Sequence, residues 1–386
     1  MDAALSLDPT ALRTLLHELA MEARTHRFEV APNPCVGAAV LGRGRVVSRG
    51  WHRVWGGPHA EIDALNAARD SAQHDGGVPP EEWEAIVVTL EPCSSVGKTG
   101  SCTQAVLDSG IRHVVVGAVD PDARHRGHGL ELLEEAGAAV YTLPGAAPLE
   151  SASPHYLRWS SFDRVRRPRP WIIAKWAQTL SGQLSPPEGE GDGRTISGPE
   201  SLAAVHQLRS RCDAILTGMG TVLADDPQLN VREPGDTSSQ PARIVLDSSL
   251  RLSPNARIFH AEPAGGPVYV LTQMGPDPVR LRALTAAGAT VVPVRGADRQ
   301  HLELRDVHTW MWEAGFRRVL LEAGPEMLEA HLNAGFVDQI QVVTGNVRGG
   351  VGPSLGSFLI PERLRERRDS ERGNDAVLEA FWVAPG

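Results

Sequence analysis

The chain has few cysteines, few aromatic residues and no long apolar run. Its 4 cysteines are irregularly spaced among 386 residues, which is not the pattern of a disulfide framework. No apolar run approaches the roughly 20 residues that span a membrane, and the N-terminus lacks the basic and apolar segments of a signal peptide. A net charge of −9 argues against an extended nucleic-acid surface, though not against a local basic pocket for one phosphate. We therefore expect a cytoplasmic protein with reduced thiols and neither a membrane nor a nucleic-acid partner.

The length of 386 residues favours two domains. Residues 144–153, rich in proline, alanine and glycine, are the predicted boundary, so the domains cover 1–146 and 147–386. In the first domain strands alternate with helices, which indicates a mostly parallel sheet covered on both faces. Its expected strands are 35–41 and 46–51, which would form a hairpin around residues 42–45, and 85–90, 113–119 and 139–143. Its expected helices are 9–23, with Asp8 as the N-cap residue and Pro9 as the first helical residue, and 58–72, 103–109 and 129–136. The second domain has a similar pattern, with strands at 171–177, 214–217, 243–247, 268–272, 290–293, 318–322, 339–343 and 376–383.

One histidine and two cysteines organise the first domain: His59, Cys93 and Cys102. An imidazole and two thiolates suit zinc, with a fourth position left open for water. Glu61 follows the histidine by two residues and is placed to transfer protons for that water without binding the metal. Residues two apart in a helix point to different faces, so we expect Pro58 to open a helix and the metal to lie beyond its N-terminal end. A structural zinc site would need a fourth ligand, and no further histidine or cysteine stands at ligand spacing.

Further motifs accompany these residues in the order found in a known family. They are 32–37 (PNPCVG), 89–94 (TLEPCS), 97–99 (GKT), and Asp120-Pro121 with Gly127 and Gly129. With them the first half resembles the deaminase domain of the bifunctional riboflavin-biosynthesis (RibD) family. The resemblance implies a cytidine-deaminase-like three-layer domain that hydrolytically deaminates 2,5-diamino-6-(5-phosphoribosylamino)pyrimidin-4-one. It also implies that Asn33 and His52 contact the pyrimidine and that Lys98 binds the phosphate.

The second half resembles the reductase domain of the same family, which is similar to dihydrofolate reductase. The matching residues are Lys175, Leu180 with Gly182, 221–227 (TVLADDP), Leu229 with Arg232, Asp247-Ser248 and 322–325 (EAGP). The resemblance implies a dihydrofolate-reductase-like α/β domain that transfers hydride from NADPH to the ribose and forms ribitol. Substrate-binding residues would be Lys175, Arg209, Leu229, Arg232 and Glu322, with Asp225 as the catalytic proton relay. Cofactor-binding residues would be Ala177, Thr195, Thr221, Asp225, Ser248, Gly324 and Pro325, the last two at a helix N-terminus suited to a phosphate.

The sequence departs from the family at several positions. In the first half, Ser95 replaces a histidine and Gly100-Ser101 replaces two prolines. In the second half, Ser181 replaces an aspartate, Gly193 and Thr195 replace a serine and a tryptophan, and a proline-lysine pair near Gly345 is missing. An alternative is therefore an active deaminase whose reductase domain is only a scaffold.

Two other classes of protein share part of this pattern. A nucleic-acid-editing deaminase has the same zinc motif, but the acidic balance of the chain argues against it. A non-catalytic zinc-stabilised binding protein would not need Glu61. The remaining cysteines, Cys35 and Cys212, are expected to be small buried hydrophobic residues. The resemblance also implies a homodimer.

Overall fold

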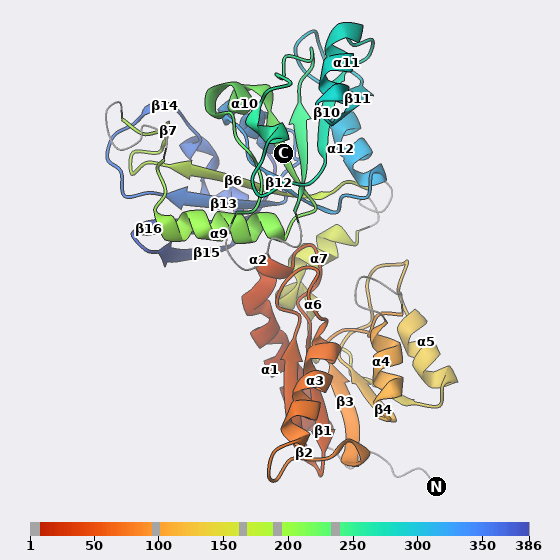
Figure 1. The fold of residues 1–386 in the computed structure, drawn as a ribbon. Helices are drawn as coiled ribbons and strands as arrows, with labels where there is room; N and C mark the ends of the chain where they lie inside the picture. The colour runs from red at the N-terminus through yellow and green to blue at the C-terminus, as the bar shows by residue number, and fades with distance from the viewer. Residues whose placement is uncertain (1–7, 95–100, 162–167, 188–194, 233–239, 386) are drawn as a thin grey trace. The chain divides into compact units, whose positions relative to one another are not determined.

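The computed structural model describes residues 8–94, 101–161, 168–187, 195–232 and 240–385. The chain forms two compact units, Met1–Arg167 and Pro168–Gly386 (Figure 1). This division falls later than the predicted boundary after residue 146, because the segment that follows packs on the first unit. Ala146 and Ala147 belong to a buried cluster of that unit, and the Ser153 hydroxyl accepts the N–H of Cys35 at 2.8 Å.

Unit 1 contains a five-stranded sheet. Its order is β2 (Arg45–Trp51), β1 (Gly37–Gly42), β3 (Trp83–Val88), β4 (His113–Val116) and β5 (Ala139–Thr142). The predicted hairpin is confirmed, because β1 is antiparallel to β2. The prediction of a mostly parallel sheet is wrong, because β1 is also antiparallel to β3, and only β3–β4 and β4–β5 are parallel. Arg43 and Gly44 form a tight turn with positive φ (51° and 66°), which is possible only between antiparallel strands.

Helices cover both faces of this sheet, as predicted. On one face, α1 (Pro9–Ala23) buries Leu12, Leu16 and Leu19 in a cluster with strand residues. On the other face lie α3 (Ala60–Ala72), α4 (Cys102–Asp108) and α5 (His128–Glu135). The remaining helices of the unit are short: η1 (Arg24–His26), α2 (Arg27–Val30), η2 (Pro80–Glu82), α6 (Leu149–Ala152) and α7 (Pro154–Trp159). The unit therefore has the three-layer architecture of a cytidine-deaminase-like domain.

Unit 2 is built on a nine-stranded sheet. Its order is β11 (Ala289–Val294), β10 (Val268–Gln273), β9 (Ala242–Leu246), β8 (Ala214–Gly218), β12 (Arg318–Leu321), β6 (Trp171–Gln178), β13 (Gln339–Thr344), β16 (Asp375–Trp382) and β15 (Leu364–Arg372). The strands from β11 to β13 are parallel, whereas β16 is antiparallel to β13 and to β15. A separate pair joins β7 (Gln183–Ser185) to β14 (Val351–Ser354).

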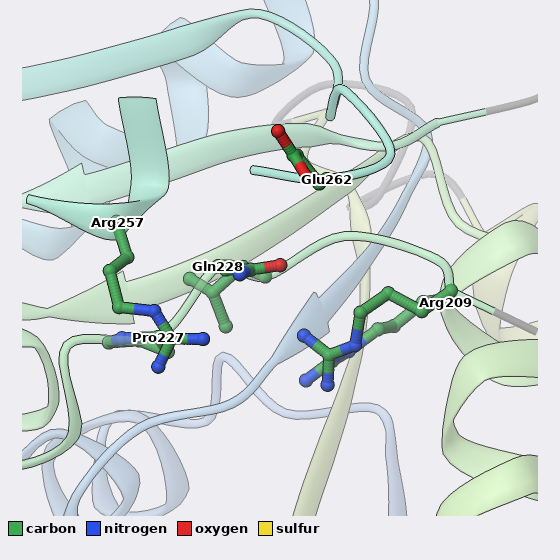
Figure 2. A pocket seen from close by; sticks show the side chains of 7 residues that line it. Arg209, Pro227, Gln228, Arg257 and Glu262 are labelled. Atoms are coloured by element: carbon green, nitrogen blue, oxygen red, sulfur yellow. The ribbon is translucent and has the colours of Figure 1, made fainter. Parts of the chain in front are cut away.

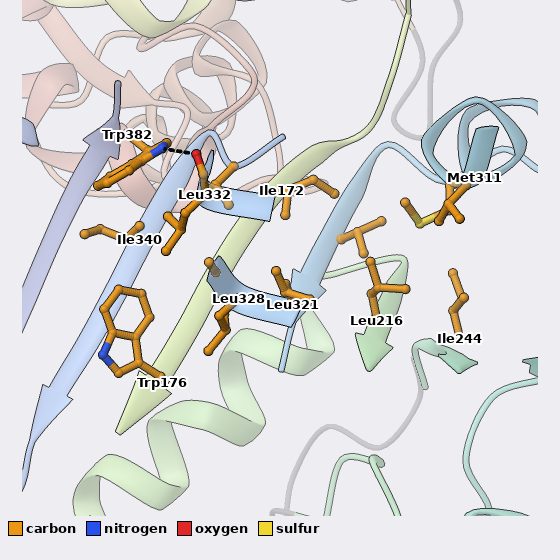
Figure 3. Close-up of a cluster of buried hydrophobic side chains, with 14 of the residues drawn as sticks. Ile172, Trp176, Leu216, Ile244, Met311, Leu321, Leu328, Leu332, Ile340 and Trp382 are labelled. Carbon is orange, nitrogen blue, oxygen red and sulfur yellow. Dashed lines mark hydrogen bonds between the residues drawn. The ribbon is translucent and has the colours of Figure 1, made fainter. Parts of the chain in front are cut away.

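The core of unit 2 lies between this sheet and helices that include α12 (Leu304–Glu313) and α13 (Pro325–Asn333). Figure 3 shows Met311, Leu328 and Leu332 from these helices against strand residues such as Leu216 and Ile340. The other helices are α9 (Pro199–Ser210), α10 (Met219–Asp225), α11 (Pro278–Ala286), η3 (Arg257–Phe259), η4 (Gly356–Phe358) and η5 (Pro361–Arg363). None of the helices in the described ranges is long and apolar enough to cross a membrane.

Three strands of unit 2 were not predicted: β7, β14 and β15. Strand β15 reads LRERRDSER, and most of its side chains are exposed because it lies at the edge of the sheet and pairs only with β16. Its register shifts between Arg365 and Arg368, as in a β-bulge. At the opposite edge, β11 contains Pro293, which has no N–H to donate.

Candidate functional site

His59, Cys93 and Cys102 meet in unit 1, at the N-termini of α3 and α4 and just after β3. His59 Nδ1 lies 3.5 Å from Cys93 Sγ and 3.3 Å from Cys102 Sγ, and the three ligand atoms all lie within 4.8 Å of one another. A tetrahedral zinc ion with ordinary bond lengths would hold nitrogen and sulfur ligands about 3.6 Å apart and two sulfurs about 3.8 Å apart. The donor atoms and their spacing therefore fit one zinc ion with its fourth position open.

The N-terminus of α3 places the histidine and the glutamate on the same side. His59 is the N-cap residue, with an extended backbone (φ −73°, ψ 162°), and the helix begins at Ala60. The prediction that Pro58 opens this helix is therefore wrong, since Pro58 precedes the N-cap. The extended backbone of His59 aims its ring at the cysteines, while Glu61 lies in the first helical turn. The His59 ring and the Glu61 carboxylate consequently face the same metal site, although the two residues are only two positions apart.

The polar groups of this cluster have shifted pKa values. Hydrogen bonding with Cys102, and then with His59, outweighs burial and lowers the pKa of Cys93. A lowered pKa favours the thiolate, which is the form that binds a metal. The Glu61 side chain is only 3% exposed, and this burial raises its pKa to about 7. A carboxyl group with such a pKa can both accept and donate a proton near neutral pH.

Two predicted pyrimidine-binding residues lie beside His59. The rings of His52 and His59 have centroids 5.2 Å apart. His52 Nδ1 is 2.9 Å from the Pro58 carbonyl, to which it donates, so its Nε2 accepts from Asn33 Nδ2 at 3.1 Å. The backbone carbonyl of Asn33 accepts in turn from the buried His155 at 2.8 Å. Lys98 and Ser95, also named from the sequence, lie outside the described residues.

Glu91 supports the metal centre and was given no role from the sequence. Its buried carboxylate accepts backbone N–H groups from Asp120 at 3.0 Å, Gly127 at 2.9 Å and Gly129 at 2.9 Å. A Cβ at Gly129 would lie 2.1 Å from the Pro92 carbonyl, so only glycine permits this approach. These contacts fix the segment that carries Cys93 against residues 120–129. An acidic residue between an apolar strand and a metal ligand is the signal that could have identified it.

In unit 2 an ion pair joins two of the predicted substrate-binding residues. Arg209 Nε donates to Glu322 Oε1 at 3.0 Å and Nη2 donates to Oε2 at 2.7 Å. Burial alone would raise the pKa of Glu322, but the charge and hydrogen bonds of Arg209 outweigh it and lower that pKa. Lys175 is half-buried nearby in β6, and burial lowers its pKa against the opposing effect of Glu322. The two side chains of the pair are 11% and 15% exposed, so this is not a surface ion pair.

A cavity of about 290 Å³ lies beside this ion pair (Figure 2), and Arg209, Leu229 and Arg232 are among the residues that line it. Asn230, which was not predicted, is fully buried behind it. Its carbonyl accepts from Arg209 Nη1 at 3.1 Å and its Oδ1 accepts from Arg232 Nη1 at 3.2 Å. Its Nδ2 donates to the Pro263 carbonyl at 2.7 Å. One asparagine therefore holds two of the predicted substrate-binding arginines.

The predicted cofactor-binding residues fall into two groups. Thr221, Gly324 and Pro325 lie together, because Thr221 Oγ1 accepts the N–H of Gly324 at 2.8 Å and Gly324 is the N-cap of α13. The others lie in separate segments of unit 2. Asp225 ends α10, Ser248 follows β9, Ala177 lies in β6, and Thr195 is exposed. Of the departures from the family, Ser181 lies in an exposed turn and Gly193 is outside the described residues.

Comparison with known proteins relates both units to one family. The family model "RibD C-terminal domain" matches residues 170–368, and "Cytidine and deoxycytidylate deaminase zinc-binding region" matches residues 11–118. The riboflavin biosynthesis protein RibD of Aquifex aeolicus is 34% identical over 352 residues, covering 90% of this chain and 92% of that protein. The Escherichia coli RibD is 32% identical over 335 residues, covering 83% of each.

Two solved structures share the fold of the whole chain. The Acinetobacter baumannii RibD superposes with a TM-score of 0.65 at 24% identity, covering 97% of this chain and all of that one (100%). A diaminohydroxyphosphoribosylaminopyrimidine deaminase/5-amino-6-(5-phosphoribosylamino)uracil reductase from Thermotoga maritima superposes with a TM-score of 0.63 at 25% identity, covering 97% and 99%. The chain therefore belongs to the RibD family of riboflavin biosynthesis enzymes, with a zinc-binding deaminase domain followed by an NADPH-dependent reductase domain.

Proposed function

We propose that the chain catalyses two consecutive steps of riboflavin biosynthesis, with the residues assigned below. Unit 1 hydrolytically deaminates 2,5-diamino-6-(5-phosphoribosylamino)pyrimidin-4-one, and unit 2 reduces the ribose of the product to ribitol with NADPH. The observation that carries the proposal is the cluster of His59, Cys93 and Cys102 next to a buried Glu61 whose pKa is about 7. A ligand set with an open position and an adjacent proton carrier is what hydrolytic deamination requires.

In unit 1, zinc held by the histidine and the two cysteines would act as a Lewis acid that makes water a nucleophile at neutral pH. Glu61 accepts one proton from the attacking water and delivers it to the ring nitrogen. It then takes the proton of the new hydroxyl group and delivers it to the amino group, which departs as ammonia while the ring C=O forms. Its burial excludes bulk water and keeps its pKa near neutrality, so both transfers are feasible. Asn33 and His52 orient the pyrimidine beside His59, and their mutual hydrogen bond fixes both side chains.

In unit 2, bound NADPH would supply a hydride to C1 of the open-chain ribose, which is double-bonded to the nitrogen that joins the sugar to the pyrimidine. Arg209 and Arg232 hold the anionic part of the substrate, and Glu322 fixes the direction of Arg209. Asp225 provides the proton to the nitrogen bonded to C1. Thr221, Gly324 and Pro325 bind the cofactor at the N-terminus of α13, where backbone N–H groups suit a phosphate.

The test is to incubate the purified protein with the diaminopyrimidine phosphoribosyl substrate and NADPH and to identify the products by mass. We expect a deaminated product that carries ribitol. A deaminated product that still carries ribose would support the alternative in which unit 2 is only a scaffold. Failure to deaminate in the presence of zinc would overturn the proposal for unit 1.

We further propose a cytoplasmic homodimer that does not act on nucleic acid. All four cysteines are free thiols, and two of them are the proposed zinc ligands, which a reducing compartment preserves. Sedimentation of the zinc-loaded protein tests the dimer. Deamination of a base in RNA or DNA by the purified chain would contradict the exclusion of nucleic acid.

A further inference from the structure

The cavity of unit 2 is lined by a third arginine that neither the sequence motifs nor the proposed mechanism uses. Arg257 lines it together with Arg209 and Arg232. Figure 2 shows Arg257 and Arg209 on the two sides of the segment that carries Pro227 and Gln228. The backbone N–H of Arg257 donates to Asp226 Oδ1 at 2.9 Å, which ties the start of η3 to the end of α10. Arg257 thus has a fixed backbone position at the mouth of the substrate cavity.

The charges around this cavity are not balanced by the protein. Glu322 neutralises Arg209, but among the described residues no carboxylate forms an ion pair with Arg232 or Arg257. Burial, and then the charges of Arg209 and Arg257, lower the pKa of Arg232, so both neighbouring guanidinium groups act on Arg232. Glu262 also lines the cavity, yet Figure 2 shows its carboxylate directed away from Arg257 and Arg209. Among the described residues, the guanidinium groups of Arg232 and Arg257 are therefore left without a carboxylate partner beside the cavity.

We propose that Arg257 binds the phosphate of the reductase substrate and, together with Arg232, makes the site selective for a phosphate monoester over a free hydroxyl group. A phosphate monoester carries about −1.5 to −2 charges at pH 7, which matches two uncompensated guanidinium groups. Arginine forms charge-assisted, often bidentate hydrogen bonds to phosphate oxygens and stays protonated. This inference rests on the proposed reductase function, which supplies a phosphorylated substrate.

The kinetic test compares Arg257→Gln with the wild type on two substrates, 5-amino-6-(5-phosphoribosylamino)uracil and its dephosphorylated riboside. We expect Arg257→Gln to raise the KM for the phosphorylated substrate about tenfold, equivalent to about 1.4 kcal/mol, and to leave the kinetics with the riboside unchanged. Arg282→Gln is the matched control, because Arg282 is an exposed arginine on α11 that does not line the cavity. An unchanged KM, or equal losses on both substrates, would overturn the inference.

A second measurement separates this inference from the reductase function itself. Ribose 5-phosphate is titrated into the zinc-loaded full-length protein by calorimetry, and binding is compared between the wild type and Arg257→Gln. A site elsewhere in the chain is present in both proteins and cancels in the comparison. If the wild type fails to reduce the substrate, the proposed reductase function is wrong, yet weaker binding by Arg257→Gln still supports the phosphate site. Equal binding by the two proteins contradicts it.

Discussion

Replacing Glu91 with glutamine is expected to destabilise the metal centre without altering a ligand. The carboxylate accepts three backbone N–H groups, two at Oε2 and one at Oε1. A glutamine whose carbonyl oxygen takes the Oε2 position keeps the bonds from Asp120 and Gly127 but turns its NH₂ group toward the N–H of Gly129. One orphaned buried donor costs about 1–3 kcal/mol, and the two remaining bonds lose charge assistance worth about 1 kcal/mol together. The expected loss of unfolding free energy is therefore about 2–4 kcal/mol in unit 1.

The assay is the release of zinc into a chromophoric chelator as urea is raised, since this signal reports unit 1 alone. With a slope of about 1–3 kcal/mol per molar urea, the expected loss moves the midpoint down by about 1 M or more. Glu84→Gln is the control, because Glu84 is an exposed glutamate of the same unit that contacts only the N–H of Gly44, at 3.3 Å. A midpoint for Glu91→Gln equal to that of Glu84→Gln would refute the reasoning.

Three further changes test the assigned roles. Glu61→Gln is expected to keep its zinc, as measured by metal analysis. Its kcat for deamination should fall about 10²–10⁴-fold, because no group of suitable pKa remains to transfer protons, and full activity would contradict this role of Glu61. Asn230→Ala removes the side-chain acceptor of Arg232 and is expected to raise the reductase KM about tenfold with little change in kcat. An unchanged KM would show that the Asn230 side chain is not needed to position Arg232. The lowered pKa of Glu322 means that its stabilisation is present above the ordinary carboxyl value of 4.5 and is lost as the pH falls below it. The unfolding free energy of wild-type unit 2 is therefore expected to fall more steeply in acid than that of Glu322→Gln, and parallel pH profiles would contradict this.

Features that depend on neighbouring residues could be predicted from the sequence. Helix α1 begins where Asp8 and Pro9 indicate, and the Asp8 carboxylate accepts the N–H of Thr10 at 3.0 Å. The strands of unit 2 that are buried on both faces were recognised from short apolar runs. The zinc-binding character of unit 1 followed from the chemistry of its ligand set, because a histidine and two cysteines offer few alternatives.

Features that depend on distant segments could not be predicted in this way. The antiparallel pairing of β1 with β3 joins strands with a long helix between them, and the alternation of elements does not reveal it. Strand β15 is charged and exposed, so it has no apolar period to recognise. Asn230 acts through Arg209 and Pro263, which are 21 and 33 residues away, and nothing in its immediate neighbourhood marks it. Tertiary contacts decide these features, not local propensity.

The two edges of the nine-stranded sheet have a consequence for how copies of this chain associate. An exposed sheet edge is a template for strands of other molecules and a common route to aggregation. At one edge Pro293 interrupts the row of N–H donors, and at the other the charged side chains and irregular register of β15 oppose a flat, continuous pairing. These features of the two edges therefore disfavour the pairing of neighbouring molecules into one extended, flat sheet.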